Sequence, residues 1–250
     1  MKLSHLTAIF AMALLLAAPG LAMADTKSNF AGALRAIETK DYSGALAILD
    51  RMEAGSDLAP AEKETVVLYR ARLSEAQGNP GAAMEALQAA AKGYPDSARP
   101  HHQLATLYQR EGKYEDAAKA YEAALERPQT VDHAPILKLD YGWFLATCPD
   151  GKYRDGARAV GLAEEMLKSF ASEKHEPLAG TLRALQIFEV AAAGHAEAGA
   201  FEKAVAAASL ASNFRNSLHK VLPATEFAKK DFDARAAGYI AGKPWRDAAQ

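Results

Sequence analysis

Side chains able to bind a metal are scattered through the sequence. After residue 24 the chain has six histidines: His101, His102, His133, His175, His195 and His219. None of them has the His-Glu-x-x-His spacing that sets two imidazoles on one helical face for zinc. His101 and His102 are adjacent, so on a helix they would point about 100 degrees apart and could not hold one ion together. We therefore predict no metal site.

Patterns typical of phosphate and nucleophilic chemistry are also missing from the sequence. Gly78 and Gly81 lack the following Lys-Ser/Thr pair of a phosphate-binding loop. No Gly-x-Ser-x-Gly turn presents a nucleophilic serine. The adjacent carboxylates Glu115-Asp116 and Glu164-Glu165 are typical of solvated helix faces. We expect no catalytic residues and no cofactor, so the chain is not predicted to be an enzyme.

The single cysteine, Cys148, excludes a disulfide framework and a multi-cysteine metal site. It is followed by Pro149-Asp150-Gly151, which predicts a turn, and no thiolate-stabilising motif lies beside it. We expect a buried and unreactive thiol. An intermolecular disulfide and a reactive thiol are the alternatives.

Composition and charge limit the class of protein further. Half of the 250 residues are apolar and 24% are charged, which is enough to bury a core. The 29 basic and 31 acidic residues give a net charge of −2, which does not favour a nucleic-acid partner. We therefore expect one or two globular domains that do not bind nucleic acid.

The first 24 residues have the order of a secretory signal peptide. Lys2 is followed by the apolar run Leu6–Ala18, the helix breakers Pro19-Gly20, and small residues ending at Ala24. The run is too short to span a membrane, although an uncleaved N-terminal anchor is the alternative. We predict a signal peptide over residues 1–24, cleaved near Ala24, and a periplasmic or secreted mature protein with no membrane span.

Beyond this segment a pattern of small residues recurs along the chain. Lys40, Gly78, Gly112 and Gly199 are each followed by an aromatic residue or proline two positions later, and then by an alanine three further on. From Ala83 to Ala117 is 34 residues, and from Ala45 to Ala83 is 38. Glycine tolerates the left-handed conformation that closes a helix, and alanine lets two helices approach closely. The pattern therefore predicts repeated helix–turn–helix pairs.

These residues resemble the tetratricopeptide repeat family, whose unit is a helix–turn–helix of about 34 residues. The segment 98–127 has the family's packing residues in register: Leu104, Ala105, Tyr108, Gly112, Tyr114, Ala117, Tyr121 and Ala124. The resemblance implies an all-α, right-handed α-solenoid of stacked helix pairs. We expect regular pairs over residues 25–128.

The repeat becomes irregular in the second half of the chain. From Ala117 to Ala159 is 42 residues, and from Ala159 to Ala204 is 45. We interpret residues 129–222 as irregular pairs of the same type, and residues 223–250 as a C-terminal capping helix and tail, because a solenoid must end on a polar face. We expect Trp245 to fold back on this cap, with a role as an interaction anchor as the alternative.

The resemblance also implies a binding surface, because first helices of successive repeats line an inner groove that holds peptides or partner segments. Carried over position by position, the groove residues are Leu68, Arg72, Glu75, Arg99, His102, Thr106, Gln109 and Arg110. Their arginines would suit an acidic segment or a C-terminal carboxylate of a protein or peptide partner. The alternative is an ordinary solvated helix surface.

The sequence therefore favours an exported adaptor that binds a protein partner through this groove. A cell-wall-processing enzyme or accessory is the second hypothesis, and it predicts a deep pocket with a carboxylate or Cys148 in a polar cluster. A periplasmic holdase is the third, and it predicts an apolar inner face.

Overall fold

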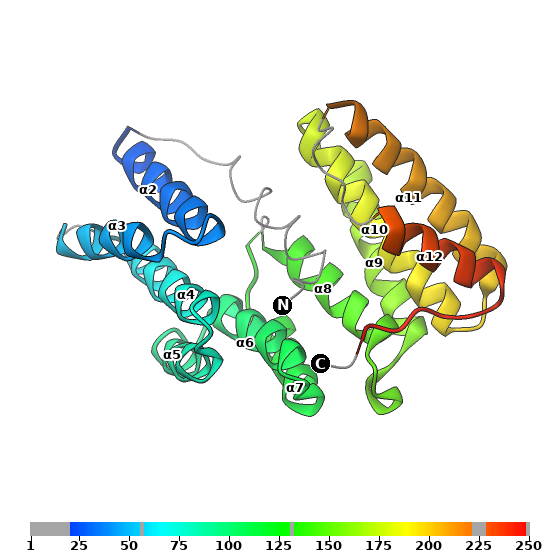
Figure 1. Cartoon of the computed structure of the whole chain (residues 1–250), viewed down its shortest axis with the longest axis horizontal. Helices are drawn as coiled ribbons and strands as arrows, with labels where there is room; N and C mark the ends of the chain where they lie inside the picture. The colour runs from blue at the N-terminus through cyan, green and yellow to red at the C-terminus, as the bar shows by residue number, and fades with distance from the viewer. Residues whose placement is uncertain (1–20, 56–57, 131–132, 222–228, 249–250) are drawn as a thin grey trace. The chain divides into compact units, whose positions relative to one another are not determined.

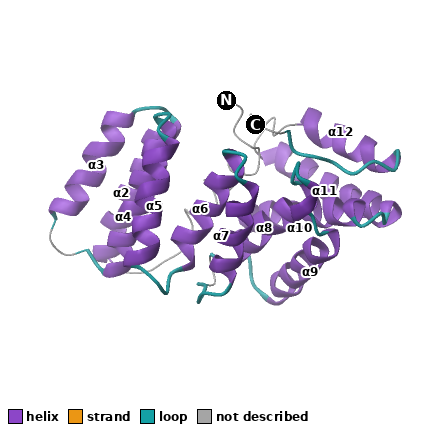
Figure 2. Cartoon of the chain, turned by 90° about the horizontal axis from the view of Figure 1, so that it is seen from below, coloured by secondary structure: helices purple, strands orange, loops and turns teal. Residues whose placement is uncertain are grey.

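The computed structural model describes residues 21–55, 58–130, 133–221 and 229–248. Within these residues helices are joined by turns and loops, and there is no strand (Figures 1 and 2). The predicted all-α repeat architecture is confirmed. The α-helices are α2 (Leu21–Glu38), α3 (Tyr42–Ala54), α4 (Pro60–Ala76), α5 (Pro80–Gly93), α6 (Ala98–Arg110), α7 (Tyr114–Leu125), α8 (Ala134–Thr147), α9 (Gly156–Ser172), α10 (Pro177–Glu197), α11 (Phe201–Val221) and α12 (Lys229–Ile240). A short 3₁₀ helix, Gly151–Tyr153, lies between α8 and α9.

Two predicted segments fall partly outside the described residues. Of the predicted signal peptide, residues 1–20 lie outside them, and α2 includes the remaining residues from Leu21. Residues 222–228, at the start of the predicted capping segment, also lie outside them. Among the helices that the structure describes, none is both long and apolar enough to cross a membrane.

The described helices form two compact units. The N-terminal unit comprises residues 21–111 and 116–129, and the C-terminal unit comprises residues 112–115 and 130–248. Within each unit, helices that follow one another in the chain pack against one another, as in α2 with α3, α4 with α5, and α10 with α11. Sequential packing of this kind is the arrangement of a helical repeat protein.

The turns within helix pairs have the predicted left-handed residue. Lys40 (φ 63°), Gly78 (φ 84°), Gly112 (φ 68°) and Gly199 (φ 76°) all have positive φ, and the next helix begins two residues after each of them. At Gly78 the following amide, Asn79 N, donates to Ser74 O at 2.9 Å, the long bond of a helix C-terminal motif. The short turn therefore reverses the chain and satisfies carbonyls of the helix it ends.

Alanine and aliphatic side chains fill the core between the helices of the N-terminal unit. One buried cluster joins α2, α3 and α4 through Ala33, Ile37, Ala45, Leu49, Met52, Val66 and Leu73. The aromatic residue that opens α3, Tyr42, packs on this cluster and its hydroxyl donates to Ala76 O at 2.7 Å. Tyr42, which the sequence pattern places at the start of the second helix of one repeat, therefore binds the first helix of the next repeat.

The C-terminal unit brings helices still closer together. A Cβ built on Gly156 of α9 would lie 2.6 Å from Gly194 O and 2.7 Å from Ala198 N. Such a contact is impossible without moving backbone, so glycine is needed where α9 meets the end of α10. Trp245 packs on the alanine-rich cluster of α10, α11 and α12, as expected for a residue that folds back on the cap.

Candidate partner-binding face

The eight predicted groove residues lie on α4 and α6 of the N-terminal unit, and they divide into core and surface positions. Leu68 is fully buried and His102 is 6% exposed, so both belong to the core. The expectation that they line an open groove is therefore wrong for these two side chains. His102 instead faces Tyr121 of α7, with 6.1 Å between ring centroids.

Arg99 is held by the preceding repeat. Its Nη1 donates to Thr65 Oγ1 at 2.9 Å and lies 3.6 Å from Glu64 Oε2. The Glu64 carboxylate also accepts from Ser97 Oγ, which caps the start of α6, at 2.6 Å. The side chain of Glu64 is 8% exposed, so this pair fixes the register of α4 on α6 and neutralises most of the Arg99 charge.

Arg110 repeats this arrangement near the other end of the two helices. Its Nη2 lies 2.8 Å from each oxygen of Glu75. Gln109 accepts at Oε1 from the hydroxyl of Tyr121 at 3.0 Å, and the Thr106 hydroxyl donates to Gln103 O at 3.0 Å within its own helix. Together with Arg99, five of the eight predicted residues are therefore engaged in contacts that stabilise the repeats themselves.

Arg72 differs from the other two arginines. It is half-buried on α4 and makes no ion pair with any residue that the structure describes. Burial raises the pKa of the neighbouring Tyr69 phenol, while the positive charges of Arg72 and Arg99 act to lower it and that of Glu38 acts to raise it. The charges of two guanidinium groups therefore act on one phenol, and one of them, Arg72, has no carboxylate partner among the residues that the structure describes.

Tyr69 is a member of this face that the sequence reasoning missed. Its ring is half-buried and packs on Phe30 of α2, with 5.3 Å between ring centroids. The available signal was the helical spacing of Thr65, Tyr69 and Arg72, which are four and three residues apart and so share one side of α4. We call the surface formed by Thr65, Tyr69, Arg72, Glu75, Arg99, Thr106 and Arg110 the α4/α6 face.

Cys148 has the surroundings expected of a buried structural thiol. Cys148 is 1% exposed, and burial raises the pKa of its thiol to about 11, so the thiol stays protonated at neutral pH. Within the described part of the chain, no group of three or more His, Cys, Asp or Glu side chains could hold a metal ion.

Comparison with known proteins identifies the repeat. The family model described as "Tetratricopeptide repeat" matches residues 75–137, which run from the end of α4 to the start of α8. No curated protein and no solved structure matches the chain. The matched segment contains the Gly112 turn and most of the packing residues on which the resemblance rested. Residues 75–137 therefore contain a tetratricopeptide repeat, and helix pairs continue on both sides of the matched segment.

Proposed function

We propose that this protein is an exported adaptor that binds an acidic segment of a protein partner on its α4/α6 face. Tetratricopeptide repeats suggest a protein–protein interaction module, because stacked helix pairs present an extended surface on which a partner can bind. The observation that carries the proposal is Arg72, a half-buried cation beside Tyr69 without a carboxylate partner among the described residues.

The chemistry of this face favours a carboxylate ligand. A guanidinium fork binds a carboxylate with two parallel hydrogen bonds, and the Tyr69 ring beside it offers apolar contact area. Arg99 and Arg110 hold the helices in register, and their partners Glu64 and Glu75 compensate their positive charge, so Arg72 is the residue expected to distinguish partners. A charged face of this kind does not favour the holdase hypothesis, and no described feature favours the enzymatic one.

Partner capture is tested first in intact cells. A photo-crosslinking amino acid at Thr106, on the α4/α6 face, should trap a defined protein, whereas the same group at the exposed Glu85 of α5 should not. The same cells report export, because the mature chain should begin at Asp25 and appear in the periplasmic fraction. Equal crosslinking from both positions would contradict binding through the α4/α6 face.

Affinity for the captured partner then tests the role of Arg72. Arg72→Gln removes the unpaired charge and should weaken binding about tenfold. Arg70→Gln is the matched control, because Arg70 lies on the same helix but pairs with Asp50 and Glu53 of α3 at 2.5 and 2.6 Å. The control should leave affinity unchanged. Equal losses for the two variants, or none for Arg72→Gln, would exclude the proposed contact.

A further inference from the structure

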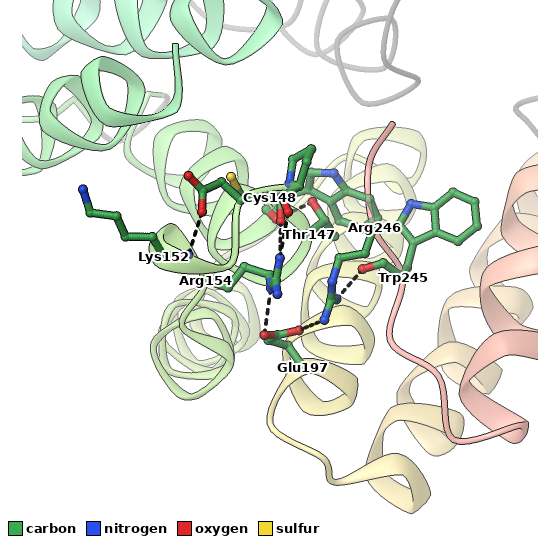
Figure 3. A network of polar contacts seen from close by, with 10 residues as sticks. Thr147, Cys148, Lys152, Arg154, Glu197, Trp245 and Arg246 are labelled. Carbon is green, nitrogen blue, oxygen red and sulfur yellow. Dashed lines mark hydrogen bonds and ion pairs between the residues drawn. The ribbon is translucent and has the colours of Figure 1, made fainter. Parts of the chain in front are cut away.

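The residues that follow α12 make specific contacts across the C-terminal unit. Gly242, with φ 68°, ends α12, and residues 243–247 then run back without helix or strand (Figure 3). We call residues 243–247 the strap. Its side chains contact α8 and α10, which lie far from it in the sequence.

Asp247 makes the central contact of the strap. One carboxylate oxygen, Oδ2, accepts from Trp143 Nε1 at 3.0 Å and from Thr147 Oγ1 at 2.8 Å. The amide of Asp247 donates to Thr147 O at 3.0 Å. Trp143 is 7% exposed and Thr147 is fully buried, so the two residues that donate to the half-buried Asp247 carboxylate both belong to the core.

The two preceding residues fix the strap on either side. Arg246 pairs with Glu197 at the end of α10, and Glu197 also accepts from Arg154 Nε at 3.0 Å (Figure 3). Arg154 in turn donates to Cys148 O at 2.8 Å, the carbonyl that follows α8. Trp245 packs on the cluster of α10, α11 and α12. The aromatic, basic and acidic side chains of the strap therefore each contact a chemically complementary group of the C-terminal unit.

The strap contacts its unit as a bound peptide would. Among the hydrogen bonds of residues 245–247 to α8 and α10, one is made by the backbone and the others by side chains. A segment held this way can open at a lower free energy than a helix packed in the core. We propose that the strap is an intramolecular ligand, and that its Asp247 closes a carboxyl-binding site formed by Trp143 and Thr147.

Burial of the Asp247 carboxyl group favours opening of the strap when that group is ionised. Burial raises the pKa of Asp247, and the hydrogen bonds from Thr147, Trp143 and Trp245 and the charge of Arg235 only partly oppose that rise. The ionised carboxylate therefore gains hydration when the strap leaves. Other titratable groups around it are the phenols of Tyr114 and Tyr239, the thiol of Cys148 and the guanidinium of Arg246. Opening would leave two donors for the carboxyl group of a partner segment.

Both tryptophans of the chain lie at this contact, so the NMR signals of their indole N–H groups report on the strap directly. The NMR spectrum should hold two indole N–H signals, and Trp245→Phe assigns them. We expect the Trp143 indole N–H to exchange with solvent at a rate that hardly changes over low urea concentrations, because local opening exposes little surface. An exchange rate that follows the global unfolding transition from the lowest urea upward would overturn independent opening.

Variants of Asp247 test the ligand itself. Asp247→Ala should accelerate exchange of the Trp143 indole N–H by about tenfold or more, whereas Asp247→Asn, which keeps an acceptor oxygen, should stay within about threefold of the parent. Lys243→Ala, at an exposed strap residue, is the control and should change nothing. An unchanged rate in Asp247→Ala would overturn the proposal. If this variant fails to fold by circular dichroism, the urea profile of the full-length parent still decides.

A small carboxylate tests the chemical class of the site. In Asp247→Ala, sodium acetate should slow exchange of the Trp143 indole N–H, whereas sodium chloride at equal ionic strength should not. The parent protein, whose site is filled by its own Asp247, should show no difference between the two salts. Equal effects of acetate and chloride on the variant would overturn a site that selects carboxyl groups.

Discussion

The two units of this protein are stabilised by polar contacts of different sequence range. In the N-terminal unit several contacts between successive repeats follow the repeat length: Tyr42 binds Ala76 34 residues away, and Arg110 binds Glu75 35 residues away. In the C-terminal unit Arg235 binds Glu189 at 46 residues, and Trp143 binds Asp247 at 104. The N-terminal unit therefore uses the same kind of contact between one repeat and the next, whereas the C-terminal unit depends on contacts that each occur once.

The largest expected effect tests the core of the regular repeat. Tyr121 of α7 is 1% exposed, and its hydroxyl donates to Gln109 on α6. Tyr121→Ala should lower the free energy of unfolding by about 3–5 kcal/mol, because it leaves a cavity between the helices of one pair. Chemical denaturation monitored by circular dichroism measures the loss.

Tyr121→Phe is the matched control, since it keeps the ring and removes one hydrogen bond. It should cost about 1 kcal/mol. Similar losses for Ala and Phe would mean that the ring contributes little to packing. Tyr114, also a packing residue of the family pattern, is only half-buried, so its replacement should cost less than that of Tyr121.

The regular part of the fold was predictable because its determinants are local. A left-handed residue, an aromatic residue or proline two positions later and an alanine three further on specify where one helix ends and how the next packs. The structure has positive φ at Lys40, Gly78, Gly112 and Gly199, the four residues selected from the sequence. The contacts of Asp247 were not predictable, because nothing near that residue in the sequence indicates α8, a hundred residues earlier.

A second prediction concerns the close approach of helices in the C-terminal unit. Gly156→Ala should lower the free energy of unfolding by about 1–3 kcal/mol, because the new methyl group would meet the backbone at Gly194 and Ala198. Gly161→Ala, on the same helix and with open space around it, should instead stabilise by up to about 1 kcal/mol through helix propensity. Urea unfolding of both variants decides, and destabilisation by Gly161→Ala of the same size would contradict the packing explanation.

The candidate site was predictable in position but not in detail. The family register placed Arg72, Arg99 and Arg110 on first helices, where the structure also has them. The sequence could not show that Glu64 and Glu75 neutralise two of the three, because both pairs join helices of different repeats. Burial of Leu68 and His102 was missed because positions lining a groove also lie next to the core.

A third prediction is a pH dependence that belongs to the C-terminal unit. The pKa of Asp247 is raised by burial in the folded protein, so the folded state binds its proton more tightly than the unfolded state does. Its contribution to stability is complete below the unfolded pKa of about 4 and is lost as the pH rises through the higher folded value. Asp247→Asn cannot titrate there, so its stability relative to the parent should increase between pH 4 and pH 7. If the stability of Asp247→Asn relative to the parent stays constant or falls between pH 4 and pH 7, the pKa of Asp247 is not raised by folding.

The smallest expected effects show what the two units share. Gly78 and Gly199 close helix hairpins in different units, both with positive φ and open space around a would-be Cβ. Replacing either by alanine should therefore cost about 1 kcal/mol, for conformational reasons alone. Lys40 holds the same conformation with a side chain, so Lys40→Gly should stabilise by about 0.5–1 kcal/mol. Thermal melting of the three variants measures these shifts. Equal costs at Gly78 and Gly199 would mean that one turn rule operates in both units, so that the irregular unit differs in its helix packing and strap and not in how its hairpins close.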